Sequence, residues 1–280
     1  MRETSETNAT VMQKTILLTG ATDGIGFETA RMLFGQGHRM LLHGRNPGKL
    51  ADTEKTLNAL PGSGSTECYV AELARMTDVE NLAAEVAGRH TRLDVLINNA
   101  GVFKTPQPVT PEGLDVRFVV NTLAPCLLTQ KLLPLIGASG RVVNLSSAAQ
   151  APVSLAALAG QVRLEDYEAY AQSKLALTMW SRHLALEFGE DGPVIVAVNP
   201  GSLLASKMVN EGFGVAGNDI RIGADILVRA ALSDEFADAS GKSFDNDAGQ
   251  FNLPHPDALD PGKAEEVVKA MQADIRKLVQ

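Results

Sequence analysis

Short apolar runs rich in β-branched residues alternate along this chain with longer stretches in which apolar residues recur every three or four positions. Runs of the first kind are typical of buried strands, and stretches of the second kind are typical of helices packed on a core. This alternation predicts a mostly parallel sheet covered by helices on both faces. Seven strands are expected: Thr15–Thr19, Arg39–His43, Glu67–Val70, Leu93–Asn98, Arg141–Leu145, Val194–Val198 and Lys242–Phe244.

Two helical segments in the second half of the chain have distinct apolar patterns. Leu175–Phe188 is apolar around most of its circumference, which predicts a helix buried on more than one side. Pro261–Leu278 is apolar on one side and charged on the other, so we expect an amphipathic helix docked on the domain.

Length and composition favour one large domain. The chain has 280 residues, of which 45% are apolar and 21% charged, and no composition break marks a linker. We therefore expect a flexible, polar arm at 1–13 and a single domain over 14–280. The net charge of −8 and the lack of a Lys/Arg cluster argue against nucleic acid as a partner.

The sequence also lacks several other signals. The polar start has no signal-peptide core, and no apolar run approaches the length of a membrane span, so we expect a cytoplasmic protein. Cys68 and Cys126 lack the neighbours of a disulfide framework or metal site, and the histidines are scattered. No metal site is predicted.

A glycine-rich turn follows the first strand. The sequence TGATDGIG at 19–26 leads directly into a helical pattern at 27–34. Such a turn lets a pyrophosphate approach the backbone at the positive end of a helix. The spacing G-x-x-x-G-x-G differs from the G-x-G-x-x-G fingerprint, so a tight turn that binds nothing stays open as an alternative.

The end of the second strand bears on the choice of cofactor. A Rossmann unit reads the adenosine ribose at about this place, usually through an acid. In this chain the end of the second strand has Gly44 and Arg45 instead of an acid. A guanidinium without a neighbouring carboxylate suits a 2′-phosphate and therefore NADP rather than NAD. The alternative is an ordinary surface arginine.

Tyr170 and Lys174 are the candidate catalytic pair. Four residues are just over one helical turn, so both side chains project from one face. Lowering a tyrosine pKa by roughly three units takes about 4 kcal/mol, which a nearby ammonium and a cationic cofactor ring can supply in a dry pocket. A solvated helix face is the alternative. Tyr167 lacks such a lysine, because its fourth neighbour is Ala171.

The glycine turn, the sequence NNAG at 98–101 and the Tyr170/Lys174 pair together resemble the short-chain dehydrogenase/reductase (SDR) family. The resemblance covers nearly the whole chain. Leu41–Asn46 and YAQSKL at 170–175 are similar to its retinol-dehydrogenase-like subgroup. The resemblance implies a Rossmann-like, doubly wound α/β fold and a homo-oligomer in which the Leu175–Phe188 helix pairs with its symmetry mate. A thick core within one chain would explain that helix equally well.

The resemblance also implies roles for individual residues. The catalytic set is Asn121, Ser147, Tyr170 and Lys174, with Asn121 holding a water near the lysine. Ser146 is the rival of Ser147, and Asn121 could instead satisfy a neighbouring carbonyl. The implied cofactor contacts are Gly20, Thr22, Asp23, Gly24, Ile25, Gly26, Arg45, Glu72, Leu73, Asn99, Ala100, Gly101, Tyr170, Lys174, Pro200 and Gly201. Glu72 departs from the family's usual aspartate, which weakens the adenine contact.

An insertion separates Ser147 from Tyr170. The 22 residues between them are more than the family's core members usually have. We expect substrate loops at 150–168 and 202–217. The apolar stretch Val153–Leu158 could form a wall for a lipophilic substrate or a small helical cap packed on the core.

The resulting hypothesis is an NADP-dependent oxidoreductase that moves hydride to or from a small or medium, lipophilic carbonyl or alcohol substrate. Tyr170 acts as general acid and base, Ser147 donates to the reacting oxygen, and Lys174 lowers the tyrosine pKa. The alternative is a non-catalytic protein on the same fold that senses NADP or binds a partner.

Tyr170→Phe should remove most turnover and leave cofactor binding nearly intact, because only the transferable proton is lost. Tyr167→Phe is the matched control and should change turnover little. Steady-state rates and cofactor dissociation constants measure both effects. Equal losses of turnover in the two variants would show that the acid is wrongly assigned.

Overall fold

One eight-stranded sheet runs through the part of the chain that the computed structural model describes, residues 12–205, 214 and 216–279. Its strand order is β3-β2-β1-β4-β5-β6-β7-β8, and all neighbours are parallel except β7 and β8. The strands are β1 Thr15–Leu18, β2 Arg39–Gly44, β3 Ser65–Val70, β4 Val95–Asn98, β5 Arg141–Leu145, β6 Val194–Asn199, β7 Ser243–Asp245 and β8 Gln250–Asn252.

The predicted doubly wound α/β fold is confirmed, with one correction to the strand count. The seven expected strands are present within about two residues of their predicted bounds, and β5 has the predicted bounds. The eighth strand, β8, was missed. It has three residues, two of them exposed and polar, so it carries no apolar run that could reveal it. Most of the expected N-terminal arm, residues 1–11, lies outside the described residues.

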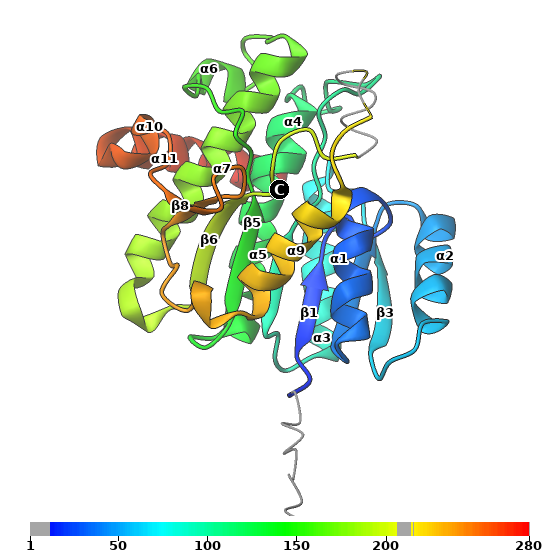
Figure 1. Cartoon of the computed structure of the whole chain (residues 1–280). Helices are drawn as coiled ribbons and strands as arrows, with labels where there is room; N and C mark the ends of the chain where they lie inside the picture. The colour runs from blue at the N-terminus through cyan, green and yellow to red at the C-terminus, as the bar shows by residue number, and fades with distance from the viewer. Residues whose placement is uncertain (1–11, 206–213, 215, 280) are drawn as a thin grey trace, which may run out of the picture.

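Helices cover both faces of the sheet (Figure 1). α1, α2 and α9 lie on one face; α3, α5 and α7 lie on the other, where α10 and α11 pack behind α7. Alternate strand residues supply the two cores, Ile16 and Leu18 on the α1 side and Leu17 on the α5 side. The helices are α1 Gly24–Gly35, α2 Pro47–Asn58, α3 Met76–Arg89, α4 Val116–Phe118, η1 Val119–Leu123, α5 Ala124–Ile136, α6 Leu155–Leu158, α7 Asp166–Phe188, η2 Gly189–Asp191, α9 Ile220–Leu232, η3 Asp234–Phe236, α10 Pro256–Leu259 and α11 Pro261–Leu278.

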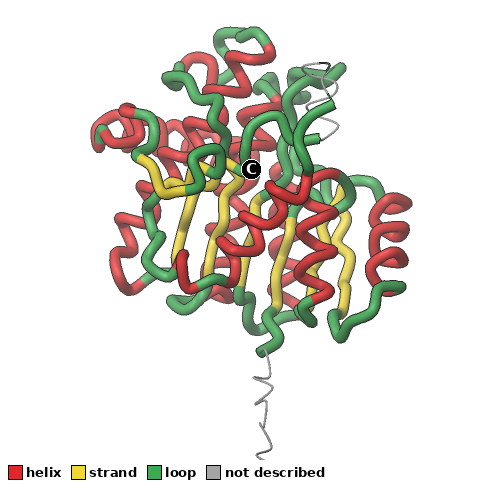
Figure 2. The backbone as a smooth tube through the Cα atoms, in the orientation of Figure 1, coloured by secondary structure: helices red, strands yellow, loops and turns green. Residues whose placement is uncertain are grey.

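The strand order reverses direction between β1 and β4, which opens a crevice at their carboxyl ends. These ends point to the top of Figure 1, and Figure 2 shows that many of the longer loops gather there. In open α/β sheets, ligands bind at this kind of crevice. The predicted glycine turn and the NNAG sequence both border it.

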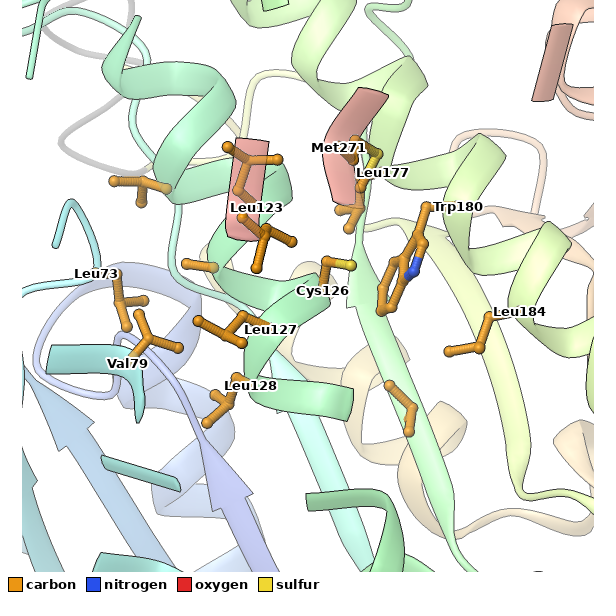
Figure 3. Close-up of a cluster of buried hydrophobic side chains, with 14 of the residues drawn as sticks. Leu73, Val79, Leu123, Cys126, Leu127, Leu128, Leu177, Trp180, Leu184 and Met271 are labelled. Atoms are coloured by element: carbon orange, nitrogen blue, oxygen red, sulfur yellow. The ribbon is translucent and has the colours of Figure 1, made fainter. Parts of the chain in front are cut away.

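The apolar circumference predicted at Leu175–Phe188 is explained within the chain. α11, which has the predicted bounds, packs across α7, so that Met271 lies against Leu177 near Trp180 (Figure 3). α5 contributes Cys126 and Leu127 to the same cluster. A partner subunit is therefore not needed to bury this helix, and the homo-oligomer stays a prediction.

The helix through α4, η1 and α5 corrects the expectation that no apolar run approaches the length of a membrane span. Val116–Ile136 has 21 residues and a mean hydropathy of 1.4, so by length and composition it could span a membrane. In this fold 72% of its most apolar 18-residue window is buried, and the helix lies between α3, the sheet and α7. Its apolar character therefore reflects a central position in the core.

The insertion at 150–168 forms a short helical cap. α6 buries Ala157 and Leu158 in the core on the α11 side, and only Leu155 of its apolar residues is exposed. Of the two interpretations of Val153–Leu158, the cap is the one that the structure shows. The other expected substrate loop, 202–217, lies partly outside the described residues.

Met271→Ala should destabilise the protein by about 2–5 kcal/mol, because it leaves a cavity between α11 and α7 where a fully buried side chain stood. Lys269→Ala, on the exposed side of the same helix, should change the free energy of unfolding by less than about 0.5 kcal/mol. Urea unfolding measures both. Equal effects would mean that α11 does not belong to the cooperative core.

Candidate active site

The glycine turn between β1 and α1 forms an anion cradle. Gly20 and Gly24 have φ of 68° and 53°, the left-handed region that favours glycine. A Cβ on Gly26 would lie 2.1 Å from the Gly20 carbonyl oxygen, so a side chain cannot fit there. The Asp23 carboxylate accepts from the Gly24 N–H at 2.7 Å and caps α1. The close backbone and the helix N-terminus fit a dinucleotide pyrophosphate.

The end of β4 is bonded directly to this turn. The Asn99 side-chain amide donates to the carbonyl oxygens of Thr19 and Gly20 at 2.9 and 3.2 Å. The Thr19 hydroxyl accepts from the N–H groups of Asn99 and Ala100 at 3.0 and 3.1 Å. Two segments predicted to contact one cofactor, 80 residues apart, are thus brought together.

His43 supports the same turn and was not singled out from the sequence. Its Nδ1 accepts from the Gly20 N–H at 3.3 Å, and its Nε2–H donates to the Ala71 carbonyl oxygen at 3.1 Å. Burial lowers the pKa of His43 to about 4, so the ring is neutral near neutral pH. A histidine at the end of an apolar strand gives no signal of this bridging role.

The structure places the predicted ribose and adenine residues differently. The Arg45 side chain is 73% exposed, and its guanidinium lies 3.9 Å from the Glu72 carboxylate. The Leu73 side chain packs in the core near Val79 (Figure 3), so only its backbone can face the crevice. A Cβ on Gly44 would lie 2.7 Å from Thr22 Cγ2, which shows that the threonine covers this glycine.

Ser147, Tyr170 and Lys174 meet above the end of β5. The Ser147 side chain lies close enough to the Tyr170 hydroxyl to lower the pKa of the phenol. The Lys174 Nζ lies 5.8 Å from the centre of the Tyr170 ring. Burial raises the pKa of the Tyr170 phenol, and the hydrogen bond with Ser147 opposes this shift. The residues predicted as acid, donor and cation therefore share one centre.

Lys174 is a buried cation held by a backbone carbonyl. Its side chain donates to the Leu145 carbonyl oxygen at 2.6 Å, and the residue is only 3% exposed. Burial lowers its pKa to about 8. The amine is thus mostly protonated at neutral pH, although its proton is held less tightly than that of a surface lysine.

The rival Ser146 is engaged elsewhere. Its hydroxyl is hydrogen-bonded to the Thr178 hydroxyl at 2.7 Å, one turn further along α7 than Lys174. The two neighbouring serines therefore serve different contacts, and Ser147 is the one that lies at Tyr170.

Asn121 sits in a π-helical turn, Val119–Leu123, and its amide is used within the fold. The amide accepts from the Val102 N–H at 2.8 Å and donates to the Val102 carbonyl and to Ser173, both at 3.0 Å. This matches the alternative role, satisfying a neighbouring carbonyl. A Cβ on Gly101 would lie 3.4 Å from Asn121 Oδ1 and 3.6 Å from Lys174 Nζ, so this glycine keeps the space between them open.

A buried arginine that sequence reasoning missed supports Tyr170. Arg117 donates two hydrogen bonds to the Asp115 carboxylate, at 2.8 and 2.7 Å, and another to Asp166 in the first turn of α7. It also donates to the carbonyl oxygen of Phe103, whose ring packs edge-on against Tyr170 with centroids 5.2 Å apart. The partners are spread over 103–166, so local sequence gives no signal of them.

The predicted Pro200–Gly201 turn is fixed from the end of β7. The Asn199 amide donates to Asp245 and Asp247, both at 2.9 Å, and the Asn199 Oδ1 accepts from the Gly201 N–H at 3.2 Å. The Gly201 φ of 112° requires glycine. This turn is therefore held to the end of β7 by hydrogen bonds.

Comparisons with known proteins agree with this geometry. A family model described as short chain dehydrogenase matches residues 14–214. Retinol dehydrogenase 13 of Homo sapiens is 30% identical over 297 residues, covering 97% of this chain and 86% of that protein. An uncharacterized protein from Mycobacterium paratuberculosis has a solved structure with TM-score 0.76 and 26% identity, covering 95% of this chain and 94% of its own. A short chain dehydrogenase from Shigella flexneri, complexed with NADP, has TM-score 0.66 and 26% identity, covering 83% and 96%.

Lys174 should make stability depend on pH in the alkaline range. Between its folded pKa of about 8 and its ordinary value of 10.5, the unfolded chain binds a proton that the folded chain does not. The stability of the wild type relative to Lys174→Met should therefore rise by about 2 kcal/mol from about pH 7.5 to about pH 9.5. Urea unfolding at both pH values measures this difference. Lys131→Met, which removes an exposed lysine, should show no such trend, and a flat difference for Lys174→Met would contradict the lowered pKa.

Proposed function

The chain belongs to the short-chain dehydrogenase family, and we propose that it transfers hydride between NADP(H) and the carbon of a carbonyl or alcohol substrate. Family membership confirms the predicted class, an oxidoreductase acting on CH–OH and C=O groups, and its similarity to the retinol-dehydrogenase-like group. One observation carries the proposal. Ser147 acts on the Tyr170 hydroxyl, and the Lys174 Nζ lies 5.8 Å from the centre of the Tyr170 ring, so the three side chains share one centre.

Tyr170, Ser147 and Lys174 have different roles at the reacting oxygen. Bound NADPH would supply the hydride, and NADP⁺ would accept it in the reverse direction. Tyr170 protonates the developing alkoxide, and Ser147 donates a hydrogen bond to the same oxygen. The Lys174 ammonium stabilises the tyrosinate that remains and so opposes the effect of burial on the tyrosine pKa. In oxidation the tyrosinate takes the proton back.

Several supports hold this group in place. Arg117 ties the first turn of α7 and Phe103 together around Tyr170, and Gly101 keeps the space beside Lys174 free. Residues held in this way need little reorganisation when charge develops on the substrate oxygen. We propose Asn121 as a positioning residue that fixes the 101–102 backbone next to the lysine.

NADP as the preferred cofactor is supported by Arg45 and by solved relatives that are complexed with NADP. Glu72 works against this preference, because its carboxylate lies near the guanidinium that would bind the 2′-phosphate. Arg45 is also exposed to solvent, so salt weakens its attraction to the 2′-phosphate. We therefore propose a moderate preference for NADP over NAD.

Other parts of the hypothesis rest on the sequence. The homo-oligomer and the cytoplasmic location remain proposals, and light scattering would measure the first. Tyr167, Leu186 and Phe188 are the large exposed apolar residues that α7 offers a partner. The argument for a lipophilic substrate is weakened, because Ala157 and Leu158 pack in the core. We retain 150–168 and 202–217 as segments that flank the substrate.

The reaction itself is tested with a broad panel of aldehydes and ketones, following the absorbance of the reduced nicotinamide. Ser147→Ala should lower kcat/KM by about 10²–10³-fold, because it removes a donor to the oxyanion. Ser146→Ala should cost much less, since its hydroxyl is paired with Thr178. No turnover on the panel, with tight cofactor binding, would favour the non-catalytic alternative. A larger loss for Ser146→Ala would move the role to that residue.

Cofactor preference is tested by changing each member of the Arg45–Glu72 pair. A charge-assisted hydrogen bond of about 1.5 kcal/mol corresponds to roughly tenfold tighter binding of NADP than of NAD in the wild type. Arg45→Ala should bring the ratio of the NAD and NADP dissociation constants close to one, and Glu72→Gln should raise this ratio. Arg75→Ala, which removes an arginine paired with Asp78, should leave it unchanged. Dissociation constants at low and moderate salt give the ratios.

An attempt to reverse the preference must also change Thr22. Gly44→Asp would place its Cβ 2.7 Å from Thr22 Cγ2, so the new carboxylate needs Thr22→Ala to fit. The triple variant with Arg45→Ala should then bind NAD more tightly than NADP. A wild type that binds NAD as tightly as NADP at low salt would contradict the role of Arg45.

A further inference from the structure

The segment 199–204 after β6 borders the anion cradle at one end. Its buried Leu204 packs on α9 at Gly223. A Cβ on that glycine would lie 2.5 Å from Leu204 Cδ1 and 3.3 Å from Ile25 Cδ1, so both side chains meet there. Because Ile25 belongs to the glycine turn, this end of the segment lies next to the proposed site of the pyrophosphate.

The other end of the segment borders the reacting centre. Asn199 and Ser147 line one cavity of about 570 Å³. A dinucleotide whose pyrophosphate lies on the cradle and whose nicotinamide lies near Ser147 would therefore pass along 199–204. The shape of this segment then decides how the nicotinamide end of the cofactor is held.

The turn between β7 and β8 holds this segment, chiefly through one carboxylate. Asp247 Oδ1 accepts from the Ser202 N–H at 2.8 Å. Its Oδ2 accepts from the Ser202 hydroxyl at 2.7 Å and from the Asn199 amide at 2.9 Å. The neighbouring Asn246 amide donates to the Pro200 carbonyl oxygen at 2.9 Å. Asp247 and Asn246 therefore hold three residues of the segment.

The charge of Asp247 suits these contacts. Burial raises its pKa, but hydrogen bonds from Ser202 and Asn199 lower it, and the pKa lies below its ordinary value. The carboxylate is thus ionised near neutral pH and accepts through both oxygens. An amide of the same size would accept through one atom only and would direct its own N–H groups at the remaining donors.

The hairpin that carries Asp247 is itself fixed to the core. The rings of Phe244 in β7 and Phe251 in β8 pack edge to face with centroids 5.0 Å apart, and each ring centroid lies 5.1 Å from that of Phe236. These contacts hold the two short strands together. They give Asp247 a defined place relative to the rest of the sheet.

We propose that Asp247 is a positioning residue that holds 199–202 against the nicotinamide end of the cofactor. The carboxylate acts through Ser202 and Asn199. A segment that is already held loses little conformational entropy when the cofactor binds, and it limits the orientations that the nicotinamide can take. This inference rests on the proposed function and adds to it a residue that none of the sequence motifs contains.

Binding of NADPH is compared with binding of 2′-phospho-ADP-ribose, which is the same molecule without the nicotinamide. Asp247→Asn should weaken NADPH binding about three- to tenfold and leave binding of the fragment within about twofold of the wild type, because the lost hydrogen bonds act at the nicotinamide end. Calorimetry gives both dissociation constants. Equal losses for the two ligands, or no loss for NADPH, would overturn the proposal.

Two further variants locate the effect. Ser202→Ala removes one of the three donors and should weaken NADPH binding about two- to threefold, again without affecting the fragment. If Asp247→Asn does not fold, Ser202→Ala decides the question, and an unchanged NADPH affinity would refute the role. Asp225→Asn changes a carboxylate beside Arg229 on α9 and should alter neither constant. A loss as large as that in Asp247→Asn would mean that net charge, and not the contact with 199–202, is responsible.

A spectroscopic measurement keeps this test separate from the proposed reaction. The fluorescence of bound NADPH comes from its nicotinamide and increases when the ring is held rigidly. Asp247→Asn should therefore lower the fluorescence of the saturated complex, whereas Asp225→Asn should not. If the wild type binds NADPH but turns over no aldehyde or ketone, the proposed function fails and this comparison still decides the role of Asp247. Equal fluorescence of the wild-type and Asp247→Asn complexes would contradict the positioning role.

Discussion

The burial of the Lys174 ammonium is the constraint on which the active centre depends. Removing a cation from water is costly, and Leu145 repays part of this cost with its carbonyl oxygen at the end of β5. The carbonyl is available because β5 ends there, and the lysine reaches it because α7 crosses behind the sheet at that point. This one contact therefore links the end of β5 to α7. The roles of Gly101 and Ser147 follow from where they lie relative to this cation.

Sequence patterns were informative wherever burial repeats with a simple period. β5 and α11 were predicted with their observed bounds because each is a continuous apolar run or a regular apolar stripe. The glycine turn and the Tyr170/Lys174 pair were recognisable because their geometry is local, within about two helical turns of chain. The structure then brought these local pieces together at the strand ends, as the alternation of strands and helices implied.

What the sequence could not reveal depends on contacts between distant segments. Arg117 is a charged residue in the otherwise apolar stretch before α5. Only its hydrogen bonds to Asp166 and to the Phe103 carbonyl explain why it is there. His43 likewise gains its role from Gly20 and Ala71, which lie just after β1 and β3. The β8 edge of the sheet could not be foreseen either, because this strand is too short and too polar to be recognised.

The order of synthesis gives the packing of α11 on α7 a further meaning. α7 ends at Phe188, and the helix that covers its second apolar side begins only at Pro261. At translation rates of about 5–20 residues per second, the side chains around Trp180 are made several seconds before Met271 and its neighbours. During that interval the growing chain carries an uncovered apolar helix that also bears the proposed acid, Tyr170. Until Pro261–Leu278 has been made, the nascent chain therefore exposes an apolar surface around Trp180, of the kind that chaperones bind.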